Sequence, residues 1–287
     1  MNQPCGIYWL SSYPKSGNTW LRIFIANLQD DRDKPIPIND IAVGGIASGR
    51  VWLDDVLGFD TADLLAEEVE ILRPYVYRWS LQDPQIAYRK IHDAYTFTME
   101  KQPLVSHEAT LGAIYLLRNP LDVVLSAANH WNCAIDKAIE HMGNHNAQFS
   151  KSTTGMGDQV TQRILSWSDH VSSWVDAKNL NCLTIRYEDM LAHPQTTFTN
   201  IATFLQLPDD PQRVAKAIRY SSFQELRKQE NEHGFQEAPA SMQRFFRNGS
   251  SGNWRSSLTP EQVARLIHDH AAMMRRFGYL DEDNNPV

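Results

Sequence analysis

The chain has 287 residues, enough for one large α/β domain with a substantial hydrophobic core. Hydrophobic residues make up 42% and charged residues 21%, as in an ordinary soluble globular protein, and the net charge is −7. This composition argues against a broad basic surface, so we expect neither nucleic acid nor an anionic membrane as a partner. An anionic ligand would therefore have to be bound by a few cationic side chains positioned at its site.

The cysteines argue against a disulfide framework and against a zinc site. Cys5, Cys133 and Cys182 are odd in number and lack CxxC spacing, a usage typical of a reducing compartment. The N-terminus lacks a basic stretch followed by a long apolar segment, and no apolar run is long enough to span a bilayer. We therefore expect a cytoplasmic protein.

The first predicted unit is a strand, a tight polar loop and a helix. Residues 7–10 form an apolar, aromatic run, and Pro14 ends the strand because it lacks an N–H donor. Small polar residues 16–19 follow, and then four apolar residues recur at helical spacing: Leu21, Phe24, Ile25 and Leu28. Such a turn directs unpaired N–H groups and a helix dipole at one spot, where Lys15 adds a charge. We predict a phosphate or sulfate site; the alternative is an ordinary βα turn with a solvated Lys15.

The loop differs from the nucleotide kinase pattern GxxxxGK[ST], because Lys15 precedes Gly17 and no lysine follows it. The order Tyr-Pro-Lys-Ser-Gly-Asn-Thr-Trp over residues 13–20 resembles the 5′-phosphosulfate loop of the sulfotransferases that use 3′-phosphoadenosine 5′-phosphosulfate (PAPS). That loop reads YPKSGTTW in the cytosolic enzymes. The resemblance implies a set of PAPS-binding residues in this loop: Lys15, Ser16, Gly17, Asn18, Thr19 and Trp20.

Further elements follow along the chain. Residues 61–72 have the pattern of an amphipathic helix, which we expect Pro74 to stop. Residues 85–92 are predicted to form a strand, and residues 113–117 a strand buried on both faces. Pro120 is expected to open the next helix, because proline suits the first helical position.

The second half of the chain begins with a segment of unclear structure. Residues 133–156 show no apolar period. The two alternatives are a disordered surface loop and a lid or substrate loop over a site, which would cover residues 133–160. Helical spacing returns over residues 162–177, and residues 183–187 are predicted to form a strand.

The C-terminal part is predicted to be helical over residues 198–205 and 211–220. The capping signals of Thr259, Pro260 and Gln262 start a final helix. Strands that alternate with helices predict an α/β fold with a doubly wound parallel sheet, in a single domain over residues 1–287. Sites in such folds lie at the carboxyl ends of the strands.

A second site candidate lies at the end of the strand predicted over residues 85–92. Lys90 and His92 would share one face there. A single histidine is more often a surface or packing residue than a base. The Lys-x-His order nevertheless resembles the Lys-Thr-His segment of the same family, which implies that His92 is the catalytic base.

A third candidate comprises Arg118, at the end of a buried strand, and Ser126, two turns into the next helix. Arg118 could instead pair with Asp122. The order Arg-Asn-Pro-x-Asp-Val-x-x-Ser resembles the second family signature, in which the Arg and the Ser hold the 3′-phosphate of PAPS. A guanidinium group suits a dianionic phosphate.

Residues 247–255 form a polar, glycine-punctuated loop that resembles the family segment RKGxxGDWK. The resemblance implies that Arg247, Asn248 and Gly249 contact the 3′-phosphate. Asn248 replaces the family's lysine and Asn253 its aspartate, so one cation is missing and the affinity for PAPS is expected to be lower.

Other matches concern the adenine ring. Residues 185–190 resemble the family's Tyr-Glu-Asp strand, which implies that Tyr187 meets the adenine edge. By the same resemblance Trp20 and Phe223 sandwich the ring, and Ser221 stands where the family has a phosphate-contacting threonine. Ordinary core packing is the alternative for these aromatic residues.

The family's dimer segment KxxxTVxxxE is not matched, since Pro260 and Ala264 stand where it has Val and Glu. The oligomeric state is therefore left open.

The resemblance implies transfer of the sulfuryl group of PAPS to a hydroxyl of a small-molecule acceptor, with an amine acceptor left open, and PAP as the product. The predicted catalytic residues are His92, Lys15, Lys90 and Ser126. No metal is required. A P-loop kinase for small molecules and a catalytically silent nucleotide-binding protein are the two alternatives.

Overall fold

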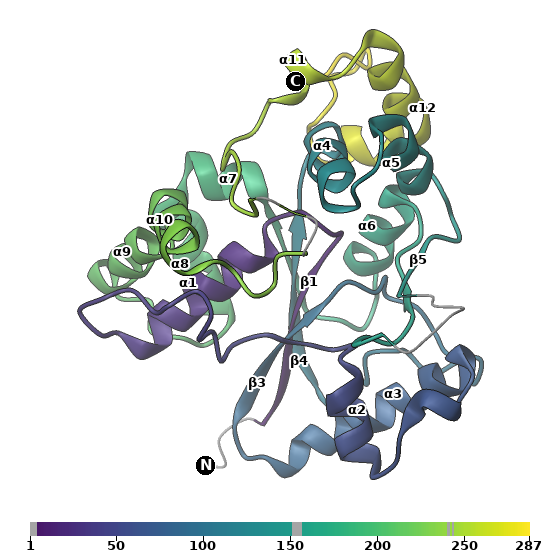
Figure 1. Ribbon diagram of the computed structural model, residues 1–287, viewed down its shortest axis with the longest axis vertical. Coiled ribbons are helices and arrows are strands. Elements are labelled where there is room, and N and C mark those ends of the chain that lie inside the picture. Colours follow the sequence, from purple (N-terminus) through teal and green to yellow (C-terminus); the bar gives the residue numbers. More distant parts are fainter. Residues whose placement is uncertain (1–4, 151–156, 240–241, 243) are drawn as a thin grey trace. The chain divides into compact units, whose positions relative to one another are not determined.

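A central parallel sheet of five strands is flanked by helices (Figure 1), which confirms the predicted α/β class. The computed structural model describes residues 5–150, 157–239, 242 and 244–287. The strand order is β2-β3-β1-β4-β7. The strands are β1 (Gly6–Ser12), β2 (Gly45–Ile46), β3 (Ile86–Ile91), β4 (Thr110–Leu117) and β7 (Cys182–Arg186).

The contacts within the fold divide into two compact units. The first unit comprises the described residues of 1–13, 44–115 and 144–184. The second unit comprises the described residues of 14–43, 116–143 and 185–287. The predicted residues of the nucleotide site all belong to the second unit, whereas Lys90 and His92 belong to the first.

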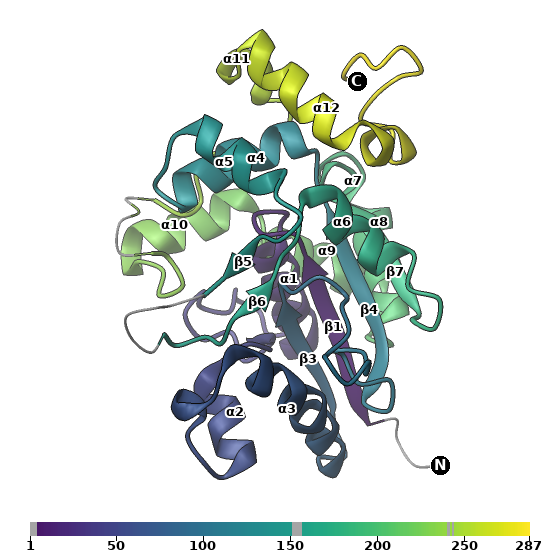
Figure 2. The same cartoon turned by 90° about the vertical axis from the view of Figure 1, so that its right-hand side faces the viewer.

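Strand β1 is the middle strand of the sheet and β3 pairs with it on one side; Figure 2 shows the two strands side by side. They pair in parallel from Gly6 opposite Ile86 to Ser11 opposite Ile91. All seven residues of β1 are buried, as the apolar run predicts. Because the strands are parallel and in register, the residues that follow them emerge at the same edge of the sheet.

The helices of the first unit are α2 (Arg50–Leu57), α3 (Ala66–Trp79) and α6 (Trp167–Val175). Two 3₁₀ turns flank α3, η1 (Thr61–Asp63) and η2 (Ser80–Gln82), and a short antiparallel pair is formed by β5 (Gln148–Phe149) and β6 (Gln162–Arg163). The Trp9 ring on β1 packs edge-on against Tyr77 of α3, with the ring centroids 4.9 Å apart.

The expectation that Pro74 stops its helix is wrong, because α3 continues through Pro74 to Trp79. Proline has no N–H for the carbonyl of Glu70, which weakens an isolated helix. Here the turn after the proline places Val76 and Tyr77 in the core, where both are almost fully buried. Burial of these two side chains offsets the missing hydrogen bond.

The helix predicted over residues 162–177 is shorter than expected and begins only at Trp167. The hydroxyl of Ser166 accepts a hydrogen bond from the Asp169 N–H and so caps the helix there. Residues 162 and 163 instead form β6.

The segment of residues 133–156 contains a helix that its sequence did not predict, α5 (Ile135–Met142) in the second unit. One face of α5 buries Ala138, Ile139 and Met142. Residues 151–156 lie outside the described residues, so a lid over residues 133–160 stays a prediction.

The second unit is mainly helical. Its other helices are α1 (Asn18–Asp30), α4 (Pro120–His130), α7 (Tyr187–Ala192), α8 (Pro194–Phe204), α9 (Pro211–Tyr220), α10 (Phe223–His233), α11 (Trp254–Ser257) and α12 (Pro260–Arg276). Helices α1 and α8 both pack against α9 (Figure 1). The predicted caps are confirmed, because Thr259 and Gln262 form a capping box at α12.

The part of the chain that the structure describes contains no helix both long and apolar enough to cross a bilayer.

Candidate functional site

The loop between β1 and α1, residues 14–19, is called the anion loop below. Gly17 occupies the N-cap position of α1 with φ 103°, and no side chain caps the helix. The first-turn N–H groups of α1 therefore keep their capacity to bind an anion. The Ser16 hydroxyl is fully buried and has no hydrogen-bond partner among the residues that the structure describes. An uncapped helix end and a buried hydroxyl without a partner both suit a phosphate group.

Lys15 contributes the charge of the anion loop. It adopts a left-handed backbone conformation, with φ 73°. Its ammonium nitrogen lies 4.4 Å from the ring centroid of Phe245, a cation–π contact within the second unit.

Arg118, which follows β4, connects the anion loop to the loop of residues 247–253. One of its Nη atoms donates to the Lys15 carbonyl and the other to the Ser250 carbonyl, both at 3.1 Å. Its guanidinium carbon lies 4.3 Å from the ring centroid of Tyr187. The Nε atom of Arg118 is buried and has no partner within the described part of the chain.

Asp122, the alternative partner predicted for Arg118, binds backbone N–H groups of another loop. The Asp122 carboxylate accepts hydrogen bonds from the backbone N–H groups of Gly252, at 2.6 Å, and Trp254, at 3.2 Å. Asp122 thereby anchors the end of the loop of residues 247–253, while Arg118 is held by carbonyl groups. The segments of residues 118–126 and 247–255, which are predicted to share a phosphate, are therefore in contact through Arg118 and Asp122.

Trp20 and Tyr187, two of the residues predicted to meet adenine, lie together. Their rings meet edge to face with centroids 5.8 Å apart. A Cβ atom at Gly17 would lie 2.8 Å from the Tyr187 ring, so the anion loop packs directly on that ring. Burial raises the pKa of Tyr187, whose hydroxyl therefore stays neutral.

Phe223, the third predicted adenine contact, lies against Gly249. Gly249 has φ 58°, and a Cβ atom there would lie 2.4 Å from two atoms of the Phe223 ring. Arg247 and Asn248 are exposed.

The two serines predicted to contact phosphate differ in their surroundings. Ser221 is fully buried, and its hydroxyl donates to the Ala217 carbonyl at the end of α9, at 2.9 Å. Ser126 is half-buried on α4.

Gly249→Ala is expected to destabilise the protein and to weaken PAP binding, because Phe223 must move away from the new methyl group. The matched control is Gly58→Ala, whose φ of 76° is similar but whose Cβ atom would meet nothing within 4 Å. We expect Gly249→Ala to lower the free energy of unfolding by about 1–3 kcal/mol more than the control does. Urea unfolding and PAP titration calorimetry measure both effects, and equal losses in the two variants would contradict this account.

His92 follows β3 in the first unit and is half-buried. Its Nδ1 atom lies 2.9 Å from the Ser12 carbonyl oxygen and 3.3 Å from the Ser12 hydroxyl. A carbonyl oxygen can only accept, so Nδ1 carries the proton and Nε2 carries the lone pair of the neutral ring. This tautomer makes Nε2 the basic atom. Lys90 lies two residues earlier on β3 and is half-buried.

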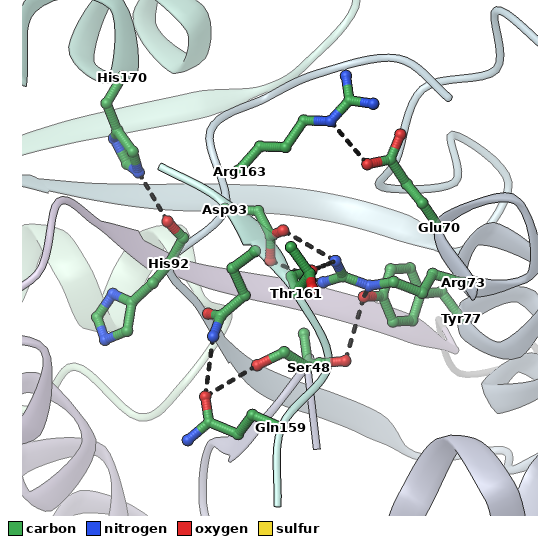
Figure 3. A network of polar contacts seen from close by, with 12 residues as sticks. Ser48, Glu70, Arg73, Tyr77, His92, Asp93, Gln159, Thr161, Arg163 and His170 are labelled. Atoms are coloured by element: carbon green, nitrogen blue, oxygen red, sulfur yellow. Dashed lines mark hydrogen bonds and ion pairs between the residues drawn. The ribbon is translucent and has the colours of Figure 1, made fainter. Parts of the chain in front are cut away.

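A buried histidine of α6, His170, contacts the segment that carries His92, and Figure 3 shows its ring directed at the His92 carbonyl. The Nε2 atom of His170 lies 3.0 Å from that carbonyl oxygen, and its Nδ1 atom lies 2.8 Å from the Tyr115 hydroxyl. Sequence reasoning did not find this role. The only signal was a histidine on the apolar face of a predicted helix, which is also typical of core packing.

The residue after His92 forms a buried ion pair, also drawn in Figure 3. Both carboxylate oxygens of Asp93 accept from the Arg73 guanidinium, at 2.8 and 2.7 Å. Arg73 Nε also donates to the Tyr77 hydroxyl, and Trp174 Nε1 donates to the Asp93 carbonyl at 3.0 Å. Helices α3 and α6 therefore both hold the segment that begins at His92.

His170 also makes stability depend on pH. Desolvation lowers its pKa to about 4, from an ordinary value of about 6.5. Between these values the folded protein binds fewer protons than the unfolded chain, so stability falls as the pH drops from 6.5 toward 4. From pH 7.5 to pH 5 this histidine should account for about 2 kcal/mol of lost unfolding free energy.

Urea unfolding at the two pH values should show a smaller loss for His170→Gln than for the wild type, because Gln does not titrate. An identical loss in the two proteins would show that His170 is not the group responsible.

Within the described residues, no group of three or more histidine, cysteine, aspartate or glutamate side chains comes together to hold a metal ion.

Comparisons with known proteins agree with the fold. The sulfotransferase domain family matches residues 7–278 of the chain. Sulfotransferase 2A6 of Rattus norvegicus is 26% identical over 259 residues, which cover 88% of this chain and 79% of the relative. Sulfotransferase 1 family member D1 of Mus musculus is 25% identical over 281 residues, which cover 92% of this chain and 82% of the relative.

Two solved structures show a similar fold. Mouse sulfotransferase SULT7A1 complexed with PAP has a TM-score of 0.59 and 23% identity, over 94% of this chain and 85% of that one. Retinol dehydratase, in complex with androsterone and the inactive cofactor PAP, has a TM-score of 0.61 and 16% identity, over 96% of this chain and 82% of that one.

Proposed function

The chain belongs to the sulfotransferase domain family, and on that premise we propose that it transfers the sulfuryl group of PAPS to a hydroxyl of a small-molecule acceptor. The observation that carries the proposal is the anion loop, in which the uncapped end of α1 and the buried Ser16 hydroxyl stand beside Lys15. Both solved structures named above contain PAP, which supports the choice of nucleotide.

The residues present fit the two anionic ends of PAPS. The N–H groups of Gly17, Asn18 and Thr19, with Lys15 and the Ser16 hydroxyl, would hold the 5′-phosphosulfate. Among the buried side-chain atoms of this unit without a partner in the described residues, three could donate to such a ligand: Ser16 Oγ, Trp20 Nε1 and Arg118 Nε.

The 3′-phosphate would lie near Arg118, whose guanidinium joins the anion loop and the loop of residues 247–253. We assign Ser126, Arg247, Asn248 and Gly249 to the same phosphate. Ser221 would first have to release its hydrogen bond to Ala217 before its hydroxyl could donate to a phosphate. Trp20, Tyr187 and Phe223 would contact the adenine ring.

In the proposed reaction the acceptor hydroxyl oxygen forms a bond to sulfur while the bond from sulfur to the 5′-phosphate oxygen breaks. His92 Nε2 takes the hydroxyl proton, which its tautomer allows. The electron pair of the broken bond stays on the phosphate oxygen, where Lys15 and the N–H groups of the anion loop stabilise it. Lys90 would steady the sulfuryl oxygens. Ser12, whose carbonyl oxygen accepts from His92 Nδ1, precedes Lys15 by three residues along the chain.

Lys15→Met is expected to lower kcat by about a hundredfold, because it removes the cation that stabilises charge on the leaving oxygen. Lys34→Met, at an exposed lysine of the same unit, is the matched control. Both variants should be folded, and steady-state kinetics with labelled PAPS separates them. If Lys15→Met kept wild-type turnover, the assignment of Lys15 would be wrong.

The proposed function is tested with the purified protein, labelled PAPS and a panel of alcohols, phenols, amines and glycans. We expect transfer of label to at least one hydroxyl acceptor, and titration calorimetry should show that PAP binds whereas ATP with magnesium does not. Binding of ATP with magnesium and phosphate transfer would support the kinase alternative. PAP binding without transfer to any acceptor would support a catalytically silent nucleotide-binding protein.

We also propose that the protein works in the cytoplasm. Cys5, Cys133 and Cys182 are all unpaired thiols, which suits a reducing compartment. The acceptor is proposed to be a small molecule, as the family suggests. A dimer built on the family's segment is not proposed, because Pro260 and Ala264 depart from its pattern.

A further inference from the structure

The backbone carbonyl of His92 contacts the buried ring of His170 (Figure 3), and that ring in turn contacts Tyr115. His170 Nε2 faces the His92 carbonyl at 3.0 Å, and a carbonyl oxygen can only accept, so Nε2 carries the proton. His170 Nδ1 then carries the lone pair and accepts from the Tyr115 hydroxyl at 2.8 Å. Every ring nitrogen of His170 is thus paired, and its tautomer and orientation are fixed.

The same imidazole also contacts the end of β1. The Tyr13 ring meets it edge to face, with centroids 5.4 Å apart and an interplanar angle of 82°. Tyr13 follows Ser12, whose carbonyl oxygen accepts from His92 Nδ1. One buried ring therefore touches the residues that follow both central strands, β1 and β3.

His170 has little freedom to move. It and Tyr115 are both completely buried. On α6 it lies one turn before Trp174, which donates to the Asp93 carbonyl. Helix α6 therefore contacts two successive carbonyl groups, those of His92 and Asp93, through two side chains on one face.

We propose that His170, oriented by Tyr115, is a positioning residue that fixes the His92 backbone relative to the end of β1. The inference rests on the proposed function, in which His92 Nε2 takes the acceptor proton. The His92 side chain hydrogen-bonds to the Ser12 carbonyl through Nδ1, and the point from which it leaves the chain is set by its own backbone. A displacement of about 1 Å at a reacting group can cost about a hundredfold in rate.

The test compares four variants with the wild type. His170→Phe removes both ring nitrogens but keeps an aromatic ring, whereas His170→Gln keeps one acceptor and one N–H donor at the end of the side chain. Tyr115→Phe removes only the hydroxyl that orients His170. Thr110→Val is the matched control, because it removes the acceptor of Trp9 Nε1 and the donor to the Ser106 carbonyl, two partly buried hydrogen bonds of the same unit outside residues 92–93.

We expect His170→Phe to lower kcat by about 10- to 100-fold and to leave the KM for PAPS and the Kd of PAP within about twofold. His170→Gln should recover most of the lost kcat, and Tyr115→Phe should lie between the two. Thr110→Val should lose stability without losing kcat. A His170→Phe protein that folds and keeps wild-type kcat would overturn the proposal, as would a His170→Gln protein that folds and recovers none of it.

A second readout does not depend on activity. Long-range ¹H–¹⁵N spectra of protein labelled at histidine report which ring nitrogen of His92 carries the proton. We expect a fixed Nδ1–H tautomer in the wild type and in His170→Gln, and a mixture of tautomers in His170→Phe and Tyr115→Phe. An unchanged His92 tautomer in both of these variants would overturn the proposal. If the wild type transfers no sulfuryl group, the proposed function fails, whereas these spectra still decide whether His170 positions His92.

Discussion

His92→Ala is expected to lower kcat by about 10²- to 10⁴-fold, the range that a general base contributes. The variant loses the atom proposed to take the acceptor proton, while the residues proposed to bind PAPS are untouched. Titration calorimetry should therefore give a Kd for PAP close to that of the wild type. Steady-state kinetics with labelled PAPS measures the loss.

The control for this prediction is His107→Ala, which removes an exposed histidine of the same unit. It should leave both kcat and PAP affinity unchanged. His92→Gln serves as a second variant, because Gln retains polarity at the site but cannot act as a base near neutral pH. Near-wild-type turnover in both His92 variants would mean that another group takes the proton.

Arg73→Met is expected to cause the largest loss of stability, about 3–5 kcal/mol, because it leaves the Asp93 carboxylate buried without its cation. Both side chains of the pair are only 1% exposed. Arg73 also donates to the Tyr77 hydroxyl, which would lose that partner. Urea unfolding at neutral pH measures the change in the free energy of unfolding.

Two further variants show whether the loss comes from the unpaired charge. The double variant Arg73→Met with Asp93→Leu removes both charges and should recover much of the stability, since buried ion pairs are often replaceable by apolar residues. Arg78→Met removes one partner of an exposed pair on the same helix, with Glu108, in which the side chains are 47% and 63% exposed. It should cost less than about 1 kcal/mol. A loss at Arg73 no larger than at Arg78 would contradict this account of the pair.

Several hydrogen bonds between distant segments were not predicted from the sequence. Arg118 was expected at a phosphate or paired with Asp122, but in the structure it binds the carbonyls of Lys15 and Ser250, which are 103 and 132 residues away. Tyr115, His170 and His92 likewise meet across 55 and 78 residues. A single sequence gives no signal for such pairs, because neither periodicity nor local spacing depends on them.

Tertiary packing also overrode two local signals. Pro74 has the chemistry of a helix breaker, but burial of the turn that follows it keeps α3 intact. Residues 133–156 are too polar to show a period, but the three buried residues of α5 were enough to stabilise one helix. In both cases the contacts that decide the outcome come from elsewhere in the chain.

The sequence by itself determined what depends on neighbouring residues: the first strand, the anion loop with Gly17 at the start of α1, and the capping box of Thr259 and Gln262. Each follows from backbone hydrogen bonding and side-chain spacing within a few residues. Only the tertiary structure decided which nitrogen of His92 is basic and what holds its backbone. That choice depends on the Ser12 carbonyl and the His170 ring, which folding alone brings to the end of β3.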